Sequence, residues 1–155
     1  MIDTFIRTQR MVWMAILSSL AALGVVAFVV MPRSGTPAPH FFLAIFVGLA
    51  IADLVAVQVL RARLLPRETP ASALDDKPPE EDTPEAREAL MKLGRVYVLS
   101  WALCESVGMF GLVATELLHQ PVYYVGFAAV ALVFLVLYRP DPDDAAGALR
   151  AIHKR

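Results

Sequence analysis

The stretch MVWMAILSSLAALGVVAFVVM, residues 11–31, decides the fold class of this chain. It contains no charged side chain, and its length matches the roughly 20 apolar residues that a helix needs to cross the hydrocarbon core of a bilayer. Three further runs resemble it, at residues 40–60, 96–118 and 122–138. We therefore predict an all-α, polytopic membrane protein whose four transmembrane helices form two hairpins.

The composition of the chain agrees with a membrane location. Hydrophobic residues make up 57% of the 155 residues and charged residues only 19%, with a mean hydropathy of +0.58. Soluble domains are about 45–50% apolar. The net charge of -1 provides no general attraction to nucleic acid, and the single Cys104 excludes an internal disulfide. We expect the lipid bilayer, and no nucleic acid, among the partners.

The first run has two alternative interpretations. A secretory signal peptide is disfavoured, because the apolar stretch is longer than an ordinary h-region and residues 35–39, GTPAP, are a poor cleavage site. Membrane strands are disfavoured because a barrel needs many alternating segments and closed edges. We therefore expect an uncleaved helical span.

The distribution of Lys and Arg predicts the orientation. Of the 14 such residues, all except Arg33 lie on one side of the predicted spans. The positive-inside rule makes that side cytoplasmic. We predict a plasma (inner) membrane protein with both termini in the cytoplasm: a first hairpin at 1–60, a linker at 61–92, a second hairpin at 93–138 and a tail at 139–155.

The linker is acidic and rich in proline, and such a composition buries too little apolar area to fold alone. It is either a solvated tether or, through residues 75–88, a docking segment for a basic cytoplasmic partner. At its end, Thr83 is a good N-cap and Pro84 suits the first helical position, so a helix is expected to begin there, with Gly94 as a weak point. In the tail, residues 141–144 are expected to precede a short helix at the membrane surface.

Carboxyl side chains inside the spans are the main candidates for a functional site. Glu105 lies ten residues past Arg95, about 15 Å into its helix, and Asp53 lies eight residues before Arg61, about 12 Å from the same face. If the two helices pack, these carboxyls could share a proton or flank a cation. Glu116 is expected at the outer interface.

The carboxyls have a second interpretation, as hydrogen-bonding groups that hold neighbouring helices together. The available polar partners in the spans are Ser18, Ser19, Ser100, Ser106, Gln58 and Thr115. Both interpretations remain open for Asp53 and for Glu105.

Small residues at short spacing predict where the helices pack closely. The second span carries Ala44, Gly48, Ala52 and Ala56. The third span carries Ser100, Cys104, Gly108, Gly111 and Thr115. Asp53 and Glu105 each directly follow one of these residues, which places them beside the predicted packing faces.

Residues 102–113, ALCESVGMFGLV, resemble the carboxylate helix of the rotary ATP synthase proteolipid, subunit c. That helix carries an Ala-Leu-x-Glu-Ala stretch followed by an aromatic-Gly-Leu-Val stretch, and the pair Pro84-Glu85 is similar to a pair in its cytoplasmic loop. The resemblance covers under a fifth of the chain. It implies that Glu105 occupies the ion-carrying position, with Ser106 and Ser100 as possible ligating hydroxyls.

Two functions are therefore expected from the residues. The first is a scaffold or accessory subunit, in a homo-oligomer or larger membrane complex, with a protonatable intramembrane carboxylate. The alternative is a protein that handles protons or cations through Glu105. We expect no enzymatic activity and no cofactor, because no nucleophile-base pair or phosphate-binding loop occurs. A metal site from His40, His119 and Glu116 is a weaker alternative to ordinary interfacial side chains.

Overall fold

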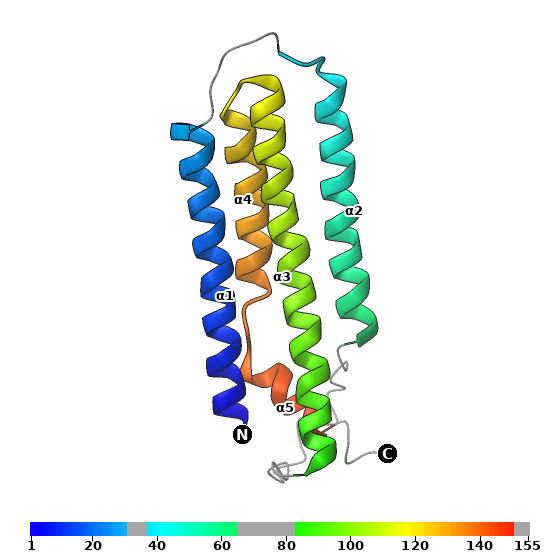
Figure 1. Ribbon diagram of the computed structural model, residues 1–155. Helices are drawn as coiled ribbons and strands as arrows, with labels where there is room; N and C mark the ends of the chain where they lie inside the picture. The colour runs from blue at the N-terminus through cyan, green and yellow to red at the C-terminus, as the bar shows by residue number, and fades with distance from the viewer. Residues whose placement is uncertain (31–36, 65–82, 151–155) are drawn as a thin grey trace.

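A computed structural model of the chain describes residues 1–30, 37–64 and 83–150, and all regular secondary structure in these ranges is helical. It consists of α1 (Ile2–Val25), the π-helical turn η1 (Val26–Val30), α2 (Phe41–Leu64), α3 (Pro84–Leu118), α4 (Val122–Leu137) and α5 (Pro142–Arg150). The helices α1 to α4 stand side by side in an elongated bundle, and α5 lies across one end (Figure 1). The all-α prediction is confirmed.

Three of the described helices are long and apolar enough to cross a membrane: α1 with most of η1, α2, and α3. The 16 residues of α4 reach only about 24 Å, less than the hydrocarbon core of roughly 30 Å. Together with α5, from which it is bent by 51°, α4 meets the same criterion. The described chain thus has three or four candidate spans.

The surface of α2 is apolar almost all the way round. Its exposed large hydrophobic side chains are Phe41, Ile45, Val47, Leu49, Ile51, Val55, Val59 and Leu64. A soluble monomer rarely exposes a contiguous apolar surface of this kind, because it would face water at high cost. The exposed surface of this helix is suited to lipid.

Helix α3 is the central element of the bundle. It has the most buried residues, and α1 and α2 pack on opposite sides of it (Figure 1). Its 35 residues span about 52 Å, so about 20 Å extends beyond a hydrocarbon core. As predicted, Thr83 caps its first turn, with Oγ1 accepting from the Ala86 amide at 3.1 Å, and Pro84 is the first helical residue.

Two boundaries from the sequence need adjusting. The predicted linker, 61–92, begins inside α2 and ends inside α3, because the capping signal at Thr83 starts α3 well before the apolar run. Most of the linker, residues 65–82, lies outside the described residues. Gly94 does not interrupt α3: a Cβ there would lie 3.0 Å from Gln9 Nε2 and 3.3 Å from Phe5 Cε2, so this glycine gives α1 room to approach.

The α3–α4 hairpin is closed by a short turn at the end of the bundle opposite the N-terminus and α5 (Figure 1). His119 adopts the left-handed conformation there, with φ 56°, and Thr115 Oγ1 accepts from the Tyr124 amide at 3.0 Å. Two aromatic side chains then join this hairpin to α1: the Trp13 indole donates to the Leu135 carbonyl at 2.9 Å, and the Tyr124 hydroxyl donates to the Leu20 carbonyl.

The short helix expected in the tail is present as α5, although it begins at Pro142 rather than after residue 144. Its face formed by Ala145, Gly147, Ala148 and Leu149 is buried, and it packs against α1 and α3. Because the acidic residues lie in its first turn and Arg150 in its last, the charges complement the helix dipole. Residues 151–155 lie outside the described chain.

Candidate functional site

The two deep carboxyl groups each accept a hydrogen bond from a serine on a different helix. Ser19 of α1 donates its hydroxyl to Oε1 of Glu105 on α3. Ser106 of α3 donates its hydroxyl to Oδ2 of Asp53 on α2. Both acids are half-buried. Each bond therefore ties one outer helix to the central one.

The helical geometry of α3 explains this arrangement. Glu105 and Ser106 are consecutive, so their side chains point about 100° apart around the helix axis. Glu105 meets α1, whereas Ser106 meets α2. Within the described chain, no hydrogen bond joins the carboxyl of Asp53 to that of Glu105. The shared proton or cation considered from the sequence stays a prediction.

The two hydroxyls suggested as ligands for an ion at Glu105 bond elsewhere. Besides Asp53, the Ser106 hydroxyl contacts the Leu103 carbonyl of its own helix at 2.7 Å. Ser100 is fully buried and donates to the Val96 carbonyl at 2.7 Å. The serine that does bond Glu105, Ser19, is one of the partners named for the helix-holding interpretation.

The small residues of the third span lie in the packed interior. Cys104, Gly108 and Gly111 are all buried. A Cβ on Gly108 would lie 2.3 Å from the Leu20 Cδ1 of α1, and one on Gly111 would lie 2.6 Å from the Phe127 Cβ of α4. These glycines permit close approach of α1 and α4, as the small-residue spacing predicts.

The small residues of the second span behave differently. Ala44, Gly48, Ala52 and Ala56 are exposed, and nothing lies within 4 Å of a Cβ built on Gly48. Helix α2 instead turns Ala50, Asp53 and Val57 toward the bundle. Among the residues that the structure describes, this stripe therefore makes no close packing, and the face of α2 that carries Asp53 lies against α3 instead.

A second polar cluster was not anticipated from the sequence, and it is centred on Arg61 near the end of α2. The Arg61 side chain is only 15% exposed, and its Nη2 lies 3.5 Å from the Asp144 carboxylate of α5. Its Cζ lies 4.4 Å from the ring centre of Tyr138 and 5.6 Å from that of Tyr97. A guanidinium within about 6 Å of an aromatic face is attracted to it.

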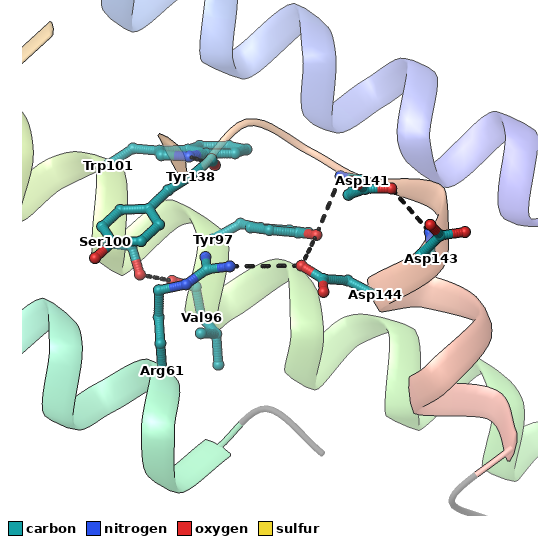
Figure 2. Close-up of polar contacts among 9 residues, drawn as sticks. All are labelled: Arg61, Val96, Tyr97, Ser100, Trp101, Tyr138, Asp141, Asp143 and Asp144. Atoms are coloured by element: carbon teal, nitrogen blue, oxygen red, sulfur yellow. Dashed lines mark hydrogen bonds and ion pairs between the residues drawn. The ribbon is translucent and has the colours of Figure 1, made fainter. Parts of the chain in front are cut away.

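Aromatic residues of α3 complete the Arg61 cluster (Figure 2). The Tyr97 hydroxyl donates to the Asp144 carboxylate at 2.7 Å and accepts from the Asp141 amide at 3.3 Å. The Trp101 indole donates to the Tyr138 carbonyl at 2.8 Å, and its ring stacks on Tyr97 with centres 5.4 Å apart. The cluster joins α2, α3, the α4–α5 turn and α5 at one end of the bundle.

The sequence contains a signal for this cluster. Tyr97 and Trp101 are four residues apart and share one face of α3, where polar tips need partners when buried. The sequence prediction uses Arg61 only for orientation and as the depth reference for Asp53, and Asp144 only as a residue that precedes the tail helix. Their contact is non-local, so spacing along the chain does not indicate it.

The described residues hold no metal-type cluster of three or more His, Cys, Asp or Glu side chains. Glu116 is exposed, while His119 is half-buried with Nδ1 lacking a hydrogen-bond partner in the described chain. A hollow of ≈ 810 Å³ lies between the N-terminal halves of α1 and α3. It is mostly apolar, and Thr4, Thr8, Gln9, Arg87 and Arg95 are its polar lining.

In comparisons with known proteins, no family model, no curated protein and no solved structure matches this chain.

Proposed function

We propose that this chain is a non-catalytic, multi-pass scaffold or accessory subunit of the inner membrane. Its intramembrane carboxyls then hold the helices together rather than carry an ion. The observation that supports this best is the use of both acids in bonds between helices: Ser19 with Glu105, and Ser106 with Asp53. A carboxyl group that accepts a hydrogen bond from a neighbouring helix stabilises the packing of the two helices.

The proposed topology has four spans with both termini in the cytoplasm. The N-terminus and α5 lie at the same end of the bundle, as an even number of crossings requires (Figure 1). The Lys and Arg bias supports assigning that end to the cytoplasm. Helix α4, with 16 residues, would be a short fourth span, accommodated by tilt of its neighbours or local thinning of the bilayer.

Assembly with other chains is part of the proposal. The exposed stripe of Ala44, Gly48, Ala52 and Ala56 has the spacing that lets helices approach closely in lipid. A second copy, or another subunit of a larger complex, is the partner we propose for α2. The acidic stretch at 75–88, largely outside the described residues, would recruit a basic cytoplasmic partner.

The alternative function, proton or cation handling through Glu105, is favoured by one observation. The Glu105 side chain is only half-buried, so a group or ion arriving from outside the bundle can still reach it. The subunit c resemblance of residues 102–113 points the same way. Ion handling requires that Glu105 can gain and lose a proton or cation, whereas the scaffold role requires only that its side chain accepts a hydrogen bond.

Substitution of Glu105 separates the two functions. Glu105→Gln keeps a carbonyl acceptor for Ser19, so the scaffold proposal expects unchanged stability and unchanged mass of the purified complex. Glu105→Leu and Ser19→Ala remove the bond, and each should cost about 0.6–1.7 kcal/mol of unfolding free energy, the range for hydrogen bonds between membrane helices. Glu116→Gln, at an exposed position, is the matched control.

Labelling with a hydrophobic carbodiimide, located by mass spectrometry, tests the charge itself. The scaffold proposal expects no label at Glu105 that depends on sodium or pH. Selective labelling of Glu105 that fades as the pH rises or as sodium is added would overturn the scaffold proposal in favour of ion handling.

A further inference from the structure

Three arginines gather where α1 passes the turn between α4 and α5. Arg7 and Arg10 lie on α1, and Arg139 follows the end of α4. All three are exposed, and none forms an ion pair with another residue of 1–30, 37–64 or 83–150. Unpaired guanidiniums on α1 and just after the end of α4 leave positive charge available to a ligand.

Two adjoining hollows lie among these arginines, with volumes of ≈ 640 Å³ and ≈ 420 Å³. Arg10, Met14 and Pro142 line both of them. Arg7 lines the larger hollow and Arg139 the smaller one. The arginines thus line two hollows that adjoin at Arg10, Met14 and Pro142, and these two hollows together form the depression discussed below.

The depression is held in place by contacts between the helices. The Trp13 indole donates to the Leu135 carbonyl at 2.9 Å, which fixes α1 against α4 one turn before Arg139. Met11 and Met14 are 61% and 55% exposed, so they present apolar surface on the side of the predicted span. The depression therefore has a cationic part at Arg7, Arg10 and Arg139 and an apolar part next to it at Met11 and Met14.

The carboxyls that line the depression are fewer than the guanidiniums. Asp3 lines the larger hollow and Asp141 the smaller one. Asp141 already accepts a hydrogen bond from the Asp143 amide at 3.0 Å, which turns it toward the start of α5. Three unpaired cations against two acids leave a net positive charge.

We propose that this depression binds the headgroup of an anionic phospholipid from the surrounding leaflet. The planar guanidinium groups of Arg10 and Arg139 suit the oxygens of a phosphate, which arginine binds in a forked geometry. Arg7 adds charge at the rim, and an acyl chain lies over Met11 and Met14. Basic pockets between membrane helices on the cytoplasmic side bind such headgroups in other proteins. The inference is independent of the role proposed for Glu105.

Native mass spectrometry of the full-length protein, released from detergent micelles, tests this site. The probes are dioleoylphosphatidylglycerol and dioleoylphosphatidylcholine, which share acyl chains and differ in headgroup charge. We expect the phosphatidylglycerol adduct to be retained preferentially. The variant Arg10→Gln/Arg139→Gln should lower its retention by about 25-fold, taking about fivefold per arginine near an anionic surface. Arg63→Gln, an exposed arginine on α2, should leave retention unchanged.

Several outcomes would overturn the proposal. Equal retention of the two lipids would do so, as would an equal loss in Arg63→Gln. Competition by glycerol phosphate at the same concentration as the lipid would show a site for a free phosphate compound rather than a lipid. If the double variant does not fold, Arg7→Gln provides the test: a loss of about fivefold supports the site, and no loss contradicts it.

Discussion

The glycines of the bundle allow a graded test of how closely its helices pack. At Gly111, an added Cβ would lie 2.6 Å from the Phe127 Cβ and 3.2 Å from the Tyr124 Cα. One of these atoms is a backbone atom of α4 and the other is the first carbon of a side chain, so both move only if the helix moves. At Gly108 the nearest atom is the Leu20 Cδ1, at 2.3 Å, which is the end of a side chain that can rotate.

The magnitudes follow from these neighbours. Overfilling a packed interior costs about 1–3 kcal/mol, and we expect Gly111→Ala in that range. Moving Leu20 off its preferred rotamer costs about 0.5–1.5 kcal/mol, which sets the expectation for Gly108→Ala. Gly126→Ala meets nothing within 4 Å and serves as the control. All three substitutions share the helix-propensity gain of alanine, about 1 kcal/mol, so differences from the control isolate the packing cost.

The assay is unfolding of the purified protein from non-ionic detergent micelles by added dodecyl sulfate, followed by helical circular dichroism. The expected order of stability places Gly126→Ala highest, Gly108→Ala next and Gly111→Ala lowest. If Gly111→Ala is as stable as the control, α3 and α4 do not approach as described, and the reasoning fails.

Two further predictions concern charged groups outside the apolar core of the bundle. Arg61→Met should lower the unfolding free energy by about 1–3 kcal/mol, less than for a fully buried ion pair, because the Asp144 side chain is 33% exposed. Arg63→Met should change the unfolding free energy little. The same unfolding assay measures both variants, and equal effects would contradict the role of the Arg61 cluster. At the start of α3, Lys92 lies 2.7 Å from the Glu88 carboxylate, and its hydrogen bond and charge hold the pKa of Glu88 below its ordinary value. The pair therefore stabilises the fold at pH values above the unfolded-state pKa of Glu88. This stabilisation is lost as the pH falls through the lowered pKa of the folded state. Lys92→Ala should raise the Glu88 pKa in a carboxyl-carbon NMR titration, and an unchanged pKa would exclude the pairing.

Counting residues along a span predicts how far a residue lies from the end of its helix, but not the direction in which its side chain points. Counting from Arg95 and Arg61 placed Glu105 and Asp53 at similar depth. Counting does not give the rotation of a helix about its own axis. Because almost every face of α2 is apolar, hydrophobic periodicity leaves that rotation open, and the small-residue stripe was assigned to the bundle although it is exposed.

Local signals were more reliable than signals for contacts between distant segments. The Thr83-Pro84 start of α3 depends on residues within one turn, and the structure contains it. The packing of Gly108 and Gly111 was also predicted, because α3 is surrounded on several sides and any small face on it meets a neighbour. The packing residues of a central helix can therefore be predicted even when the rotation of that helix about its axis is unknown. For a peripheral helix such as α2, the same prediction requires the rotation.

The contacts of Arg61 also cannot be predicted by counting residues along α2. An arginine at the end of a span is expected to extend into water or the headgroups, and this expectation treats the helix as isolated. Here α5 lies across the end of the bundle and brings Asp144 to Arg61, while Tyr97 and Tyr138 cover its sides. The guanidinium is buried because the chain folds back over it. Helix α5, which lies outside the apolar runs, thus determines whether an arginine near the end of a span is exposed at the interface, like Arg10, or buried within the fold, like Arg61.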